Sequence, residues 1–181
     1  MTDRDRHPGD PDSIATERLV LTPLRVADAE EMSAVLGDPA LYEFIGGSPP
    51  TPAQLRDRYT AQVAGPEVSR ETWRNWIIRE RETGAAAGYV QATIDADGTN
   101  AEIAWVVGTP WQGRGYASEA ARAVADWLAA GGVATITANV HPEHKASAAV
   151  ARAAGLTPTD AIVDGERVWH RPGGAGSAAH S

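Results

Sequence analysis

Hydrophobic residues recur along the chain with two different periods, and the changes of period divide it into strands and helices. The first apolar segment, residues 18–24, predicts a strand. A helical spacing then predicts a helix over residues 28–36, which Asp28 can cap, and another over residues 51–63. The next segments are rich in tryptophan, isoleucine and valine, and they predict strands at residues 72–79, 87–94 and 101–107.

The second half of the chain carries the strongest helical pattern. Apolar residues at positions 117, 120, 121, 124 and 128 share one helix face, and Gly131 marks its end. A glycine-rich loop precedes this helix. The remaining predicted elements are a strand at residues 135–140, a helix at 145–154, and a hairpin of strands 161–163 and 167–170 around Asp164-Gly165.

This order of elements indicates one mixed α/β (α+β) domain over residues 16–171. We expect a twisted, mostly antiparallel sheet of about six to seven strands with about four helices. Strands and helices do not simply alternate, so a doubly wound nucleotide-binding fold fits poorly. Residues 1–15 and 172–181 are polar or small and aperiodic, and they are expected to be flexible tails.

Composition narrows the classes of function. The chain has 181 residues, enough for one domain, and a formal net charge of -8. An acidic surface disfavours non-specific binding to nucleic acids or membranes and favours cationic substrates. The sequence has no cysteine, which excludes disulfides, thiolate catalysis and cysteine-based zinc sites. It has no signal-peptide pattern and no apolar run long enough to cross a bilayer, so we expect a cytoplasmic protein.

The segment most informative about function is the loop Gln112-Gly113-Arg114-Gly115-Tyr116-Ala117, between a predicted strand and a predicted helix. The first turn of a helix offers free N–H groups and a positive dipole end, which suit a pyrophosphate. Gly113 and Gly115 let the main chain approach a phosphate, and Arg114 can add a charged hydrogen bond. An ordinary structural turn is the alternative, because short glycine motifs often occur by chance.

Two common phosphate-binding loops do not match this segment. A Walker A loop needs Lys-Ser/Thr where Tyr116 and Ala117 stand, and a dinucleotide-binding loop needs a third glycine in place of Ser118. The pattern Gln112-x-x-Gly115-x-Ala117 instead resembles the Gln/Arg-x-x-Gly-x-Gly/Ala signature of the GNAT N-acetyltransferase superfamily. Residues 16–21 and 144–156 resemble two further segments of its ribosomal-protein alanine acetyltransferase (RimJ/RimL-like) branch. The resemblance covers residues 16–171.

The resemblance implies transfer of an acetyl group from acetyl-CoA to a primary amine. The acceptor can be a protein N-terminus or a small amine such as an aminoglycoside or polyamine, and a homodimer is compatible with this family. No metal is expected, because the spacing of His141, Glu143 and His144 matches no usual zinc site. The residues that the family motif implies for coenzyme binding are Val106, Val107, Gln112, Gly113, Arg114, Gly115, Tyr116, Ala117, Ser118, His144 and Ser147.

Two positions depart from the family pattern. His144 replaces an asparagine that lies near the coenzyme in the family, so that contact is in doubt. Ala151 stands where many relatives carry the tyrosine that protonates the leaving thiolate, so another acid or water must serve. Because Ala151 cannot donate a proton, a non-catalytic acyl-CoA-binding sensor or scaffold is the alternative function.

The acetyl transfer needs a neutral amine, and Glu102 is the candidate general base. An amine with a pKa near ~10 is neutral in only about one molecule in a thousand at pH 7. Alternation along the strand places Glu102 on one face with Ala104 and Val106, although many strand carboxylates merely face water. A main-chain N–H near Val107 would stabilise the oxyanion. Ser147 is a second catalytic candidate, with an ordinary helical serine as the alternative.

The acceptor side has three weaker candidates. Tyr42 and Phe44 lie in the predicted loop between the first two helices, a region that walls the acceptor site in similar proteins. Trp73 and Trp76 point to opposite faces of their strand, so one can pack in the core while the other lines the acceptor cleft. Trp76 is the third candidate, and core packing of both tryptophans is the alternative.

Overall fold

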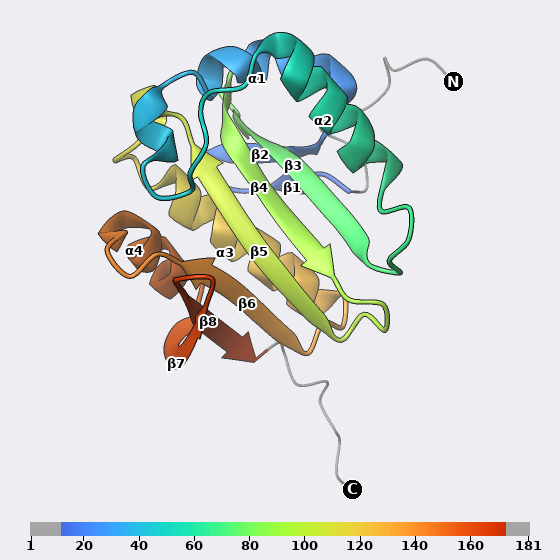
Figure 1. The fold of residues 1–181 in the computed structure, drawn as a ribbon, viewed down its shortest axis with the longest axis vertical. Coiled ribbons are helices and arrows are strands. Elements are labelled where there is room, and N and C mark those ends of the chain that lie inside the picture. Colours follow the sequence, from blue (N-terminus) through green and yellow to red (C-terminus); the bar gives the residue numbers. More distant parts are fainter. Residues whose placement is uncertain (1–11, 173–181) are drawn as a thin grey trace, which may run out of the picture.

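A sheet of eight strands runs through the part of the chain that this computed structural model describes, residues 12–172 (Figure 1). The strand order is β1-β2-β3-β4-β5-β6-β8-β7, and every neighbouring pair is antiparallel except β5 and β6. This is the mixed α/β (α+β) domain that the sequence predicts. The strands are β1 (Ile14–Ala15), β2 (Leu19–Pro23), β3 (Thr72–Glu80), β4 (Ala86–Ile94), β5 (Asn100–Val107), β6 (Thr135–Val140), β7 (Thr157–Val163) and β8 (Glu166–Pro172).

Helices cover both faces of the sheet, with α1 and α2 on one face and α3 and α4 on the other (Figure 1). Thr51 starts α2 as predicted: its hydroxyl accepts a hydrogen bond from the Gln54 N–H at 3.1 Å, and the Gln54 side chain accepts from the Thr51 N–H at 3.0 Å. Within residues 12–172, no helix has the length and apolar character needed to cross a membrane. The helices are α1 (Ala29–Val35), α2 (Pro52–Ala64), α3 (Tyr116–Ala130) and α4 (Lys145–Ala153), with 3-10 turns η1 (Val26–Asp28), η2 (Pro39–Tyr42) and η3 (Thr109–Trp111).

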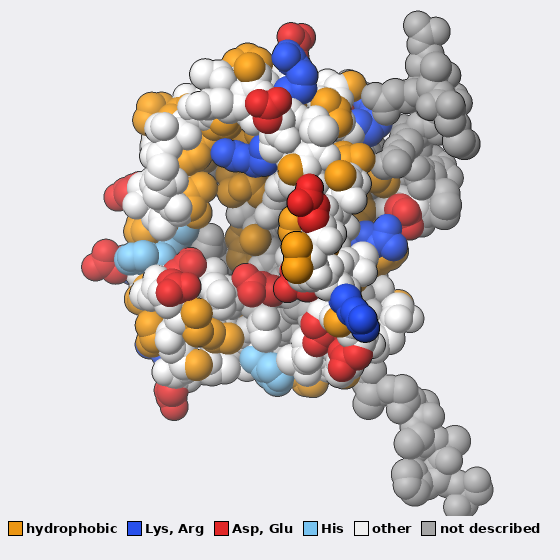
Figure 2. All heavy atoms as spheres, turned by 45° about the vertical axis from the view of Figure 1, so that its right-hand side comes forward, with side chains coloured by type: hydrophobic (Ala, Val, Ile, Leu, Met, Phe, Trp, Pro, Cys, Tyr) orange, Lys and Arg blue, Asp and Glu red, His pale blue; other side chains and the backbone are white. Residues whose placement is uncertain are grey.

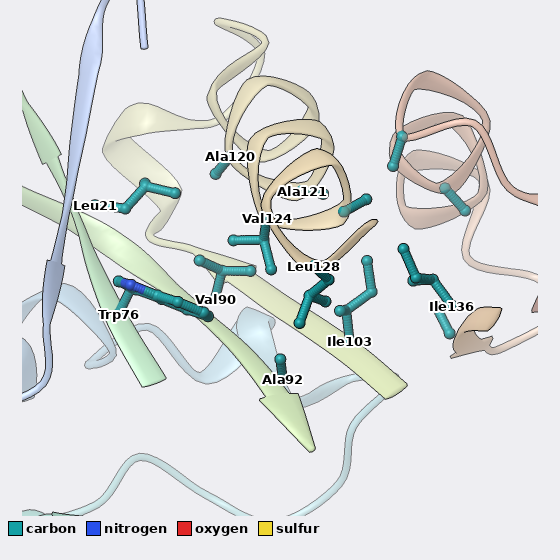
Figure 3. Packing of buried hydrophobic residues seen from close by; sticks show 14 of the residues in the cluster. Leu21, Trp76, Val90, Ala92, Ile103, Ala120, Ala121, Val124, Leu128 and Ile136 are labelled. Carbon is teal, nitrogen blue, oxygen red and sulfur yellow. The ribbon is translucent and has the colours of Figure 1, made fainter. Parts of the chain in front are cut away.

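The larger hydrophobic core lies between the sheet and α3 (Figure 3). Val124 and Leu128 of α3 point toward the sheet, where Ile103 of β5 is 1% exposed. Burying each such side chain stabilises the fold by about 1.5–3 kcal/mol. Because side chains alternate along a strand, the burial of Ile103 under α3 turns Glu102 toward the face that α1 and α2 cover.

Asp28 precedes α1 as predicted, but its side chain does not cap that helix. The carboxylate is 3% exposed and accepts hydrogen bonds from the Arg25 N–H at 2.9 Å and from the Arg79 guanidinium at 3.0 Å. A buried carboxylate needs such partners because an unpaired charge is costly away from water. Asp28 therefore does not act as the predicted helix cap. Its carboxylate instead forms an ion pair with Arg79, which connects the start of α1 to β3.

Residues 12–15 belong to the folded domain, although the sequence placed them in a flexible tail. Ile14 and Ala15 pair with β2, and the Trp76 Nε1–H donates to the main-chain oxygen of Asp12 at 2.8 Å. This edge strand brings the described sheet to eight strands, above the expected six to seven. β7 begins at Thr157, earlier than the predicted residue 161. The other parts of the two predicted tails, residues 1–11 and 173–181, lie outside the described residues.

Candidate active site

β5 and β6 separate part-way along their length, which opens a fork in the sheet. Beyond Glu102, β5 continues to Val107 paired with β4 alone. No described strand pairs with the other edge of β5 there, so its main-chain N–H and C=O groups can bind a ligand. The parallel pairs that hold the closed end of the fork are Asn100↔Thr135, Ala101↔Ile136 and Glu102↔Thr137.

A cavity of about 780 Å³ opens in this fork. One wall is β5 from Glu102 to Val107, and the other is the end of β6 with the first turns of α4. Residues 40, 41 and 43–45, between α1 and α2, and Glu166 at the start of β8 complete the lining. Figure 2 shows a hollow in the surface, with acidic and histidine side chains along one side of it. The volume lies in the range of small-molecule and cofactor sites.

The glycine loop forms one end of the cavity and leads into α3. Gly113 and Gly115 have φ angles of +76° and +79°, in the left-handed region that favours glycine. Gly115 is the N-cap residue of α3, and none of the described side chains caps the helix at this position. The first N–H groups of α3 are therefore free, and the helix dipole adds a partial positive charge. This combination is suited to binding an anion such as a pyrophosphate.

Two side chains from outside the loop hold it in shape. Glu80 of β3 accepts hydrogen bonds from the Trp111 Nε1–H at 2.8 Å and from the Tyr116 hydroxyl at 3.1 Å. One carboxylate thus joins the residues on both sides of the two glycines. Arg18, directly before β2, donates to the main-chain oxygen of Arg114 at 2.7 Å. The geometry of the loop is therefore fixed by residues that come much earlier in the chain.

Glu102 lies where the fork opens, and its exposed side chain borders the cavity. Partial burial raises the pKa of its carboxyl group, and the negative charges of Glu166 and Glu71 raise the pKa further. A carboxylate with a raised pKa is a stronger base than one free in water. Glu102 therefore has the position and the electrostatic environment of a general base.

His144 is the N-cap residue of α4, directly before Lys145. Its Nδ1 accepts a hydrogen bond from the Ser147 N–H at 3.3 Å, and its ring stacks on Phe44 with centroids 4.4 Å apart. Burial lowers the pKa of His144, and the neighbouring His141 lowers the pKa further, whereas Glu43 opposes both effects. The neutral ring is therefore favoured, which is the form whose Nδ1 can accept the capping hydrogen bond.

Comparison with known proteins assigns this domain to a family. Residues 18–157 match the family model described as the acetyltransferase (GNAT) domain. The chain belongs to the GNAT acetyltransferase family. No curated protein matches this GNAT sequence.

Three solved acetyltransferase structures share the fold of this GNAT domain. The acetyltransferase from Agrobacterium tumefaciens is 27% identical, with a TM-score of 0.70 over 88% of this chain and 93% of that chain. RimL, a ribosomal L7/L12 alpha-N-protein acetyltransferase in complex with coenzyme A, is 17% identical. Its TM-score is 0.75, over 88% of this chain and 97% of that chain. The microcin C7 self-immunity acetyltransferase MccE, in complex with acetyl-CoA and AMP, is 16% identical. Its TM-score is 0.75, over 90% of this chain and 97% of that chain.

Most of the coenzyme residues predicted for this GNAT domain line the 780 Å³ cavity. Gln112 borders it but turns its side chain back, because Nε2 donates to the main-chain oxygen of Val107 at 3.0 Å. Arg114 and Ser118 are absent from the lining among the described residues. The predicted residues on the cavity are Phe44, Glu102, Val106, Val107, Gln112, Gly113, Gly115, Tyr116, Ala117, His144 and Ser147.

The remaining acceptor candidates of the GNAT domain lie elsewhere. Tyr42 lines a neighbouring cavity, and its hydroxyl donates to the main-chain oxygen of Leu36 at 2.9 Å. Trp76 is 1% exposed and packs edge-on against Trp127 with ring centroids 5.3 Å apart, so it is chiefly a core residue. It reaches a smaller cavity under α2. Within the described ranges, no group of three or more side chains is placed to hold a metal ion.

Sequence reasoning missed several residues of this GNAT site. Glu166 approaches Glu102 because β8 lies beside β6, an arrangement that only the strand order reveals. Its one local signal is its place directly after the turn at Asp164-Gly165. Other cavity residues that the sequence did not mark are Trp105 and Asn139.

Proposed function

We propose that this protein is an N-acetyltransferase that moves the acetyl group of acetyl-CoA to a primary amine. The observation that carries the proposal is one cavity that joins an uncapped helix N-terminus at Gly115 to a carboxylate of raised pKa at Glu102. The first suits the coenzyme pyrophosphate and the second suits deprotonation of an ammonium group. The acetyl-CoA in MccE and the coenzyme A in RimL support the same donor here.

The donor half of the site would work mainly through main-chain groups. The N–H groups after Gly113 and Gly115 would bind the pyrophosphate, and the free edge of β5 at Val106 and Val107 would bind the pantetheine arm. Acetyl-CoA supplies the activated acyl group as a thioester. A main-chain N–H near Val107 would stabilise the negative charge that develops on the carbonyl oxygen during attack.

Glu102 would accept the proton of the acceptor ammonium, directly or through a water. The free amine then attacks the thioester carbon and the C–N bond forms; the C–S bond breaks to release the thiolate, and the nitrogen gives up its second proton to water. Ala151 is 0% exposed and has no acidic proton, so water or the Ser147 hydroxyl would protonate the thiolate. The acceptor is an amine of the kinds expected from the sequence, a protein N-terminus or a small amine. A homodimer and a cytoplasmic location also stay predictions.

A second candidate function is an acyl-CoA-binding sensor without turnover. The observation that favours the sensor is Ala151, which stands where many relatives carry the tyrosine that protonates the departing thiolate. Glu102 counts against it, because a sensor has no need of a carboxylate with a raised pKa at the open end of the fork.

The proposal is tested by replacing Glu102 with glutamine and measuring coenzyme A release with a panel of amines. We expect kcat to fall about 100- to 10 000-fold while affinity for acetyl-CoA stays nearly unchanged. Glu82→Gln, at an exposed turn between β3 and β4, is the matched control and should behave as wild type. Equal rates for wild type and Glu102→Gln across pH 6–9 would remove Glu102 from the mechanism. Tight coenzyme binding without release above background hydrolysis would favour the sensor.

A further inference from the structure

Two smaller cavities extend from the proposed active site along the face that α1 and α2 cover. The nearer one has a volume of about 440 Å³ and shares Ile45 and Val106 with the cavity in the fork. The inner one, of about 220 Å³, lies between α2 and strands β3 and β4, and shares Leu36, Arg58 and Tyr89 with the nearer one. Neighbouring cavities therefore lead from Val106 on β5 to the underside of α2.

The inner cavity contains a buried hydroxyl group without a partner. The Tyr59 side chain is 4% exposed, and its hydroxyl makes no hydrogen bond within residues 12–172. A buried polar group in this state costs about 1–3 kcal/mol, so it points to a ligand that would supply the missing acceptor. Burial raises the pKa of the neighbouring Tyr89 to about 12, which keeps that hydroxyl protonated as well.

The charged group that lines the inner cavity is Arg58. The described residues provide it with no salt bridge, in contrast to Arg56 on the same helix, which lies 3.7 Å from Glu30. Its positive charge opposes the rise in the pKa of both Tyr59 and Tyr89, which places the guanidinium within electrostatic reach of the two hydroxyls. No Asp or Glu among the described residues lines either small cavity.

The charges of this region are thus divided. Glu43, Glu102 and Glu166 line the cavity in the fork, whereas Arg58 lines the other two. In Figure 2, acidic side chains lie on one side of the hollow and a basic side chain lies on the opposite side. The acidic part suits an ammonium group, and the basic part suits an anion.

We propose that the Arg58–Tyr59–Tyr89 cavity binds an anionic group of the acceptor, a carboxylate or a phosphate, while the acceptor amine reacts in the fork at the free edge of β5. This inference rests on the proposed function and narrows its acceptors to amines that also carry an anion. The carboxamides of Gln62, Asn75 and Gln91 also line the cavity and can donate hydrogen bonds to anionic oxygens. β5 and β3 are two strand spacings apart, about 10 Å, so the amine and the anion would be separated by a distance of that order.

The test compares acceptors of equal length that differ at one end. 6-Aminohexanoate and 6-aminohexyl phosphate provide the anion, and 1,6-diaminohexane and hexylamine lack it. We expect kcat/KM for the better anionic amine to exceed that for the diamine about 10- to 100-fold, and Arg58→Gln to abolish the difference. The ratio between carboxylate and phosphate identifies the preferred anion. Arg56→Gln, two residues away on the same helix and outside the lining of both small cavities, should keep the wild-type preference.

Tyr59→Phe is an independent test, because we expect it to change stability and ligand affinity in opposite directions. Removing the unpaired hydroxyl should raise the unfolding temperature of the free protein and lower the affinity for 6-aminohexanoate. The inference is overturned if the diamine is acetylated as fast as the anionic amines and if Arg58→Gln does not change these rates. The proposed function would stay intact in that case. If no amine is acetylated, the proposed function fails, and calorimetric titration of the coenzyme-bound protein decides this site. Binding of an anionic amine that Arg58→Gln abolishes then supports it, and absence of binding overturns it.

Discussion

The two sides of β5 are built from different parts of the polypeptide. On the proposed donor side, the binding groups would be main-chain N–H groups presented by Gly113, Gly115 and the free edge of β5. On the proposed acceptor side, the groups would be side chains that include Arg58 and Tyr89, from segments far apart in the sequence. A surface made of main chain depends on a few backbone angles, whereas a surface made of side chains can change one residue at a time. The donor side is therefore a property of the fold, and the acceptor side a property of this sequence.

The largest expected effect on the donor side comes from Gly115→Val. A β-branched residue at φ +79° costs about 1–3 kcal/mol, and the new Cβ would lie 3.3 Å from the Arg18 guanidinium. We expect the dissociation constant for coenzyme A, measured by calorimetry, to rise about 10- to 100-fold.

Gly132→Val is the control for Gly115→Val, because Gly132 has a φ of +98° at the opposite end of α3. It should lower the unfolding temperature by a similar amount and leave coenzyme affinity unchanged. Normal coenzyme binding by Gly115→Val would show that the donor side does not depend on this backbone conformation.

A smaller effect is expected from Glu80→Gln, which changes the support of the loop and no group of the binding surface. A glutamine replaces one of the two acceptor oxygens by an NH2 donor and removes the charge, so the charge-assisted hydrogen bonds from Trp111 and Tyr116 are both weakened. Loss of this charge assistance is worth about 1–2 kcal/mol, and we expect coenzyme affinity to fall about 5- to 30-fold. The KM for the amine should not change. Glu82→Gln is the control, and equal coenzyme affinities of the two variants would disprove the role of Glu80.

The smallest effect concerns His144, whose neutral ring caps α4. Since its pKa in the folded protein lies below the ordinary value near ~6.5, the unfolded chain takes up the proton first as pH falls. Stability from this residue is therefore present above about pH 6.5 and is lost as pH falls below that value. His144→Asn keeps a capping side chain without a titration. We expect urea unfolding at pH 7.5 and 5.5 to show about 0.5–1 kcal/mol less pH dependence in this variant. The same pH dependence in both proteins would contradict the assignment.

The secondary structure could be predicted where the signals are local. The cap at Thr51 and the apolar face of α3 each lie within a few residues, so the bounds of both helices follow from the sequence. β1 escaped prediction because two residues carry no period, and its pairing with β2 is a tertiary contact. The carboxylate of Asp28 was assigned to a helix cap because the competing partner, Arg79, lies fifty-one positions further along.

The distinction between local signals and tertiary contacts also explains how much of the candidate site could be predicted from the sequence. The donor loop is continuous in sequence, so its glycines could be placed by motif and spacing. Glu166 reaches the neighbourhood of Glu102 through the strand order β5-β6-β8, and Arg58 reaches Tyr89 through the packing of α2 on the sheet. Neither relation has a counterpart in the order of residues along the chain. The assignment of the individual site residues stays a prediction until the variants are measured.

The fork between β5 and β6 has a consequence for how such a protein can evolve. A binding site built from main-chain groups does not depend on particular side chains, so most substitutions along β5 would preserve it. A gene copy could therefore acquire a new acceptor by changing a few side chains under α2, and it would inherit the donor geometry without further selection.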